Sequence, residues 1–141
     1  QTFFSSDKTC PTEGNNELLA SVHTPEFLNT IRCSGVPNHE LTLKVGTPIM
    51  LIRNIDHAAG LCNETRLVVT KLGKYIIEAQ SISREHTGNK LFIPRMTLSP
   101  SDHWIPFKFQ RRQFPIMVSY AMTINKSQGQ SLSKVGLILK K

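Results

Sequence analysis

The sequence predicts an α/β fold that carries a β-rich insert. The first observation is a strand, a short helix and a second strand, in that order, over residues 115–139. This order is typical of a βαβ unit, whose sheet is parallel and buried. The second observation is a run of four or five short strand-like segments between residues 40 and 94, separated by turn residues. Their number and spacing favour a small β-barrel.

The first part of the chain has weaker signals. Residues 2–4 are β-prone, whereas the polar stretch over residues 5–16 predicts a long loop. Pro25 follows Thr24 at the start of a short pattern with hydrophobic residues at helical spacing, which predicts a helix over residues 25–31.

The hydrophobic period changes to two from Glu40 onward. Alternation of apolar and polar residues indicates strands, and Gly46 indicates a bend between the first two. Gly73 and Lys74 predict the turn of a hairpin. The expected strands cover residues 41–45, 48–52, 66–72, 75–79 and 90–94.

Residues 94–106 are expected to form a loop, and residues 107–109 to pair with a neighbouring strand. Phe114 and Tyr120 alternate with apolar residues, which favours packing in the core over an exposed stacking face for a base. Trp104 is expected in the core or at a domain junction.

The positive charge is concentrated at one end of the chain. The net charge is +7, and residues 103–141 contain seven Lys or Arg residues and no Asp or Glu. Residues 1–102 contain ten of each sign. Such segregation is expected of a surface that binds a polyanion, although a solubilising basic surface is the simpler alternative.

Other classes of chemistry find no support. Cys10, Cys33 and Cys62 are far apart and form no C-x-x-C pair, and the five histidines have unrelated spacings, so we predict neither a metal site nor catalytic residues. The thiols are expected to be free, in an intracellular compartment. No apolar run reaches the ~20 residues that span a bilayer, so no membrane partner is expected.

Residues 119–132 contain the most informative pattern. Small polar and cationic residues follow a β-prone segment, and together they offer hydroxyl, amide and ammonium groups around one helix start. The chemistry fits contact with a nucleic-acid backbone, although an ordinary capped helix explains the same pattern. The predicted contacts are Thr123, Asn125, Lys126 and Ser127, with Arg111 and Arg112 as further candidates.

This stretch resembles the fifth motif of superfamily-one DNA helicases of the PIF (petite integration frequency) family, including the helicase parts of plant rolling-circle transposons. Residues 43–54, 60–67 and 111–115 also resemble segments of that family. Glu64 departs from the family, in which this position is usually Gly. The resemblance implies contact with the backbone of single-stranded DNA, and it places Gln128, Gly129 and Gln130 near the nucleotide.

The resemblance also implies a domain plan. Residues 1–39 and 104–141 would form two parts of a RecA-like second motor domain (2A). Residues 40–103 would form an inserted Src-homology-three-like barrel (2B). Full-length members use ATP and Mg²⁺, move 5′ to 3′, and act in DNA repair, DNA recombination and telomere maintenance. A nuclear location is expected, with an organelle as the alternative.

The chain lacks the parts that hydrolyse ATP. It has no G-x-x-x-x-G-K-[ST] phosphate loop, no acidic metal-binding motif and no final arginine motif. We therefore expect no cofactor and no ATPase activity in this chain alone, with the missing motor half as a partner. Two alternatives stay open: a helicase-derived protein-interaction module without DNA binding, and a non-functional truncated copy.

Overall fold

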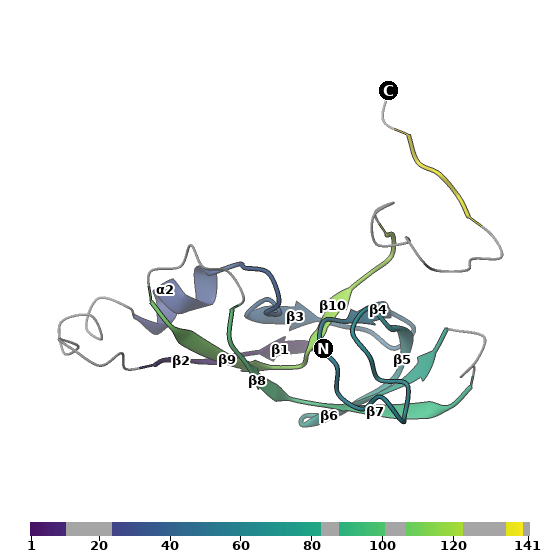
Figure 1. Ribbon diagram of the computed structural model, residues 1–141, viewed down its shortest axis with the longest axis horizontal. Coiled ribbons are helices and arrows are strands. Elements are labelled where there is room, and N and C mark those ends of the chain that lie inside the picture. The colour runs from purple at the N-terminus through teal and green to yellow at the C-terminus, as the bar shows by residue number, and fades with distance from the viewer. Residues whose placement is uncertain (11–23, 83–87, 101–106, 123–134, 140–141) are drawn as a thin grey trace.

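In a computed structural model, the residues described below form a β-rich structure with three antiparallel sheets (Figure 1). The structure describes residues 1–10, 24–82, 88–100, 107–122 and 135–139. The elements are β1 (Thr2–Phe4), β2 (Ser6–Thr9), α2 (Pro25–Thr30), β3 (Glu40–Thr42), β4 (Pro48–Leu51), β5 (Arg66–Leu72), β6 (Ile76–Ser81), β7 (Lys90–Pro94), β8 (Met96–Leu98), β9 (Phe109–Gln113) and β10 (Ile116–Val118).

The largest sheet has five strands in the order β10-β4-β5-β6-β7. Its hairpin between β5 and β6 confirms the predicted turn, because the Gly73 N–H donates to the Ile76 carbonyl at 3.0 Å. A Cβ atom at Gly73 would lie 2.6 Å from the same oxygen, so only glycine fits here without a shift. The predicted strand over residues 90–94 is also confirmed, as β7.

The core lies on the inner face of this sheet and extends to β1 and β3. Inward residues alternate with outward ones along β6 and β7, as expected for strands with one buried face. The buried cluster consists of Phe3, Leu41, Leu43, Ile49, Leu51, Leu61, Leu67, Val69, Ile77, Ala79, Leu91, Ile93, Phe114 and Ile116. Phe114 therefore packs in the core, as predicted.

Two smaller sheets complete the fold: β1 pairs with β3, and β9 lies between β2 and β8. Two of these strands were not predicted. β2 lies in the polar stretch expected to be a loop, and β8 lies in the expected loop over residues 94–106. Both loop predictions are therefore wrong. Each strand is held by hydrogen bonds to β9, which lies outside the segment from which its structure was predicted.

Helix α2 begins where the sequence predicts. The Thr24 hydroxyl accepts a hydrogen bond from the Phe27 N–H at 3.3 Å, and Pro25 occupies the first turn. Leu28 is the buried residue of the helix. The last turn contains no basic residue of its own, so any positive charge at this end must come from elsewhere in the fold.

The described residues contain no parallel strand pair, which differs from the predicted βαβ unit. The strand expected over residues 115–121 is β10, and it pairs antiparallel with β4. Val135–Leu139 is no strand; its large apolar side chains are exposed, and the segment extends away from the sheets (Figure 1). Tyr120 is 74% exposed, which corrects its predicted place in the core. The helix expected over residues 125–131 and Trp104 lie outside the described residues.

Three strand pairs cross the predicted domain boundaries. β1 pairs with β3 across residue 40, while β8 pairs with β9, and β4 with β10, across residue 103. The β-rich insert is therefore joined to its flanking segments by backbone hydrogen bonds.

Candidate nucleic-acid interface

The predicted motif residues Thr123, Asn125, Lys126 and Ser127, and the nucleotide-proximal Gln128, Gly129 and Gln130, lie outside the described residues. The described part of the predicted interface is therefore the arginine pair on β9. The side chains of Arg111 and Arg112 lie on opposite faces of β9.

Strand β9 alternates strictly between buried and exposed residues. Phe109, Arg111 and Gln113 are buried, whereas Gln110 and Arg112 are exposed. Successive side chains of a strand point to opposite faces, so two adjacent arginines cannot share one surface here. Arg112 faces outward, and Arg111 faces α2.

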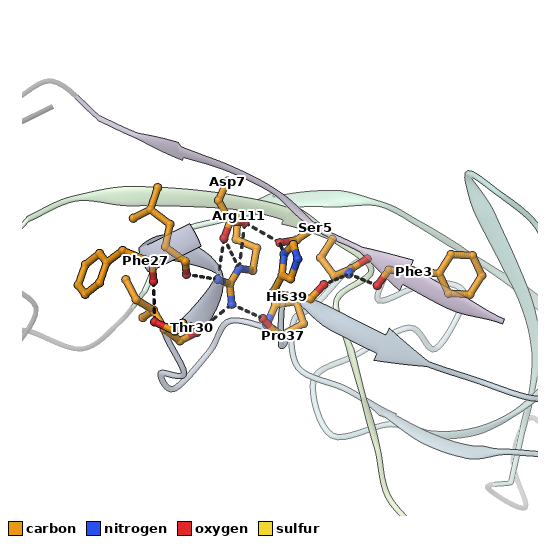
Figure 2. Close-up of polar contacts among 11 residues, drawn as sticks. Phe3, Ser5, Asp7, Phe27, Thr30, Pro37, His39 and Arg111 are labelled. Atoms are coloured by element: carbon orange, nitrogen blue, oxygen red, sulfur yellow. Dashed lines mark hydrogen bonds and ion pairs between the residues drawn. The ribbon is translucent and has the colours of Figure 1, made fainter. Parts of the chain in front are cut away.

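Every N–H donor of the Arg111 guanidinium has an acceptor within the chain (Figure 2). Nε donates to both Asp7 carboxylate oxygens at 3.0 Å, and Nη2 donates to Asp7 Oδ2 at 2.6 Å. Nη2 also donates to the Leu28 carbonyl at 2.7 Å. Nη1 donates to the carbonyls of Ile31 and Pro37 at 3.0 and 3.1 Å.

These contacts give Arg111 a structural role. Leu28 and Ile31 lie at the C-terminal end of α2, where free carbonyls and the helix dipole favour a positive charge. Arg111 supplies that charge from β9, and the Asp7 carboxylate on β2 balances it. Because all five donors are used and the residue is 1% exposed, we remove Arg111 from the set of residues expected to contact DNA.

A polar network continues from this ion pair. The Ser5 hydroxyl donates to Asp7 Oδ1 at 2.7 Å and lies 2.8 Å from His39 Nδ1 (Figure 2). Since the single hydroxyl proton goes to Asp7, Nδ1 of His39 is the donor to Ser5. Gln113 Nε2 donates to the carbonyls of His39 and Phe3. The network therefore links β9 to β1, β2 and the segment before β3.

Arg112 is the predicted contact that remains on the surface. It lies opposite Ser6 of β2 and Thr97 of β8, both of which are exposed. Its guanidinium makes no hydrogen bond or ion pair with the described residues. Arg112 is thus available to an external anion. The alternation along β9 was the sequence signal that could have separated Arg112 from Arg111.

A groove of about 610 Å³ lies between β3 and β10. Both strands are edges of their sheets within the described residues. The groove is lined by all three residues of each strand, together with the segment from Arg32 to Asn38 and residues of β4. Residues of two edge strands therefore line one hollow.

Among the residues that the structure describes, no three His, Cys, Asp or Glu side chains gather closely enough to hold a metal ion. Within the same residues, no helix is long and apolar enough to cross a membrane.

Comparison with known protein families shows which family this region resembles. Residues 26–72 match the family profile described as DNA helicase Pif1, 2B domain. The match begins in α2 and ends with β5. This chain contains the 2B region of a Pif1-family helicase.

Relatives of known name agree with this assignment. The ATP-dependent DNA helicase PIF1 of Xenopus laevis is 32% identical over 127 residues, which cover 82% of this chain and 18% of the relative. Two solved Pif1 structures share the fold. The Candida albicans Pif1 helicase has a TM-score of 0.61 at 23% identity, with 96% of this chain and 32% of that chain covered. Bacteroides Pif1 bound to single-stranded DNA has a TM-score of 0.59 at 22% identity, covering 95% and 28%.

The chain therefore spans about a fifth of the length of the Xenopus laevis Pif1 helicase. The resemblance to the helicase family read from the sequence is confirmed over this region.

Proposed function

We propose that this chain is part of an ATP-dependent 5′–3′ DNA helicase and contributes contacts to the backbone of single-stranded DNA. The observation that carries the proposal is the structural similarity to Bacteroides Pif1 bound to single-stranded DNA over 95% of this chain. The exposed, unpaired Arg112 and the concentration of positive charge after residue 102 support it.

Backbone contact is assigned to four motif residues and to one residue of β9. Thr123, Asn125, Lys126 and Ser127 supply hydroxyl, amide and ammonium donors, and Arg112 supplies a guanidinium. These groups bind phosphates in any sequence context, so we expect binding that tolerates changes of sequence and weakens steeply with salt.

The remaining parts of the machinery are proposed to lie in the rest of the helicase. Gln128, Gly129 and Gln130 would lie near the nucleotide, whereas the phosphate loop and the metal-binding acid are absent from the sequence. ATP and Mg²⁺ would thus be bound mainly by the missing motor half, and this chain alone would not turn over ATP. We retain the division into 2A segments over residues 1–39 and 104–141 and a 2B barrel over residues 40–103. Action on nuclear or organellar DNA, in repair, recombination or telomere maintenance, belongs to the same proposal.

The test is fluorescence anisotropy of a labelled single-stranded oligonucleotide, titrated with the 141-residue chain at two salt concentrations. The variant Lys126→Ala should weaken binding, and the matched variant Lys44→Ala, which removes an exposed lysine of the loop before β4, should not. Absence of binding at low salt by a folded, monodisperse sample would refute the proposal. Measurable ATP turnover by the purified chain would refute its second part.

The groove between β3 and β10 favours the protein-interaction module as the second candidate. Two open strand edges can accept an extended peptide through backbone hydrogen bonds. This candidate predicts that Lys126→Ala leaves every activity of the chain unchanged.

A further inference from the structure

Arg95 lies at the corner where β7 ends and β8 begins, between the two larger sheets. Its Nη1 group donates to the Phe4 carbonyl at 2.8 Å and to Gln113 Oε1 at 3.2 Å. The guanidinium carbon lies 4.8 Å from the centre of the Phe114 ring and 5.8 Å from that of Phe3. These contacts fix the half-buried guanidinium in one position.

A second arginine, Arg112, occupies a neighbouring position in the backbone. In the β8–β9 ladder Met96 pairs with Gln113, so the register places Arg112 diagonally across from Arg95. Diagonal neighbours lie about 7–8 Å apart, within the reach of two long side chains. Burial and the positive charge of Arg112 both lower the pKa of Arg95, and Tyr75 acts in the opposite direction. An anion bound between the two guanidinium groups would relieve this repulsion.

An exposed aromatic ring flanks the same corner. Ile76 pairs with Pro94 at the end of the β6–β7 ladder, so the next residues, Tyr75 and Arg95, lie at the same end of that ladder. Tyr75 is 69% exposed. The Lys74 ammonium lies 5.3 Å from the centre of the Tyr75 ring and adds a third positive charge.

We propose that Arg95, Arg112 and Tyr75 form a second contact for single-stranded DNA, separate from the motif at residues 123–127. The two guanidinium groups would bind backbone phosphates, and Tyr75 would stack on an adjacent base. Cations beside an exposed aromatic ring are typical of a site for single-stranded DNA, because its unpaired bases can stack on the ring while the neighbouring phosphates contact the cations. This inference rests on the proposed function and extends the contact surface to the corner between β7 and β8.

Anisotropy titrations with the intact chain test the second contact. Arg112→Gln and Tyr75→Ala change exposed side chains, and each should weaken binding to an oligothymidine roughly tenfold. Arg112→Gln should also lower the slope of log affinity against log salt by about 0.7, the value for one phosphate contact on a single strand. The matched controls are Lys44→Gln and Phe92→Ala, which change an exposed lysine of the loop before β4 and an exposed aromatic residue within β7 that pairs with Glu78.

An oligonucleotide with abasic positions separates the two kinds of contact. On this probe Tyr75→Ala should lose its effect, whereas Arg112→Gln should keep it. If both variants bind like the unchanged chain while Lys126→Ala binds more weakly, the second contact is refuted, and the proposed function stands on the motif residues 123–127 without Arg112. If the unchanged chain does not bind DNA, the proposed function and this inference both fail.

Discussion

The Asp7 carboxylate and the Arg111 guanidinium form a buried ion pair between residues 104 positions apart, with 2.6 Å between Oδ2 and Nη2. Both side chains are 1% exposed. The pair joins β2 to β9 and, through Arg111, holds the C-terminal end of α2. A charge that the sequence associates with DNA thus serves to hold three elements together.

Removal of Asp7 should be strongly destabilising. The variant Asp7→Ala leaves the Arg111 guanidinium buried without its counter-ion, and breaking a buried pair in this way costs about 3–5 kcal/mol. Chemical denaturation of the variant and the unchanged chain measures the difference in the free energy of unfolding. Lys8→Ala, at the exposed neighbouring position, is the matched control and should change little.

The pair also predicts that lysine cannot replace Arg111. The ammonium of lysine has three N–H donors. The guanidinium of Arg111 uses five N–H donors to contact Asp7 and three backbone carbonyls. Arg111→Lys should therefore lose most of the stability that Asp7→Ala loses. A loss below about 1 kcal/mol in both variants, the range of surface pairs, would contradict the structural role.

The turn between β5 and β6 gives a third prediction. In Gly73→Ala the new Cβ would meet the Ile76 carbonyl oxygen at 2.6 Å, and the backbone of a tight hairpin cannot move aside easily. Such overpacking costs about 1–3 kcal/mol, which thermal unfolding would measure. Gly136→Ala is the control, since no atom lies within 4 Å of its added Cβ. Equal stability of the two variants would contradict the steric argument.

Strands with an apolar face could be predicted from the sequence, because apolar and polar residues alternate along each of them. The hairpin of β5 and β6 and the strand β7 are examples. Strand β2 could not be predicted, because its inward residues, Asp7 and Thr9, are both polar. A buried carboxylate at Asp7 is explained only by Arg111, which pairs with it across the sheet. The charge pattern led to the expectation of a surface for a polyanion, which stays a prediction. It could not separate Arg111 from Arg112, because only the pairing of β9 decides which one faces inward.

Glu64 gives a fourth prediction, because its backbone has a positive φ of 68°. It is the third residue of a turn in which the Thr65 N–H donates to the Cys62 carbonyl at 3.1 Å, a place where glycine is favoured. The chain keeps the turn despite the departure from glycine noted in the sequence. Because the left-handed conformation costs a residue with a Cβ about 1–2 kcal/mol, Glu64→Gly should raise the unfolding free energy, by about 1 kcal/mol at most after the entropy of the unfolded chain is counted.

A second variant separates the backbone from the side chain. Glu64→Ala removes the carboxylate but keeps the Cβ, so the strain remains and no gain is expected. Equal stabilisation by alanine and glycine, measured by thermal unfolding, would show that the Glu64 side chain and not its φ angle is the source of the effect.

Glu78 on β6 gives a prediction about pH. The hydrogen bond from the Thr70 hydroxyl, at 2.8 Å, is the main cause that lowers the pKa of Glu78, and the Lys90 ammonium, at 3.5 Å, adds to it. A carboxyl with a lowered pKa stabilises the fold above its ordinary pKa. That contribution is lost as the pH falls through the lower, folded-state pKa.

The variant Thr70→Val removes the hydroxyl and nearly keeps the shape of the side chain. We expect the pKa of Glu78 to rise toward its ordinary value, and the loss of stability on acidification to become smaller. An NMR titration of the Glu78 carboxyl carbon measures the pKa directly. Lys90→Met is the comparison and should raise the pKa less, because its charge acts across an exposed surface. A larger rise in Lys90→Met than in Thr70→Val would show that the ion pair, and not the hydrogen bond, governs this carboxyl.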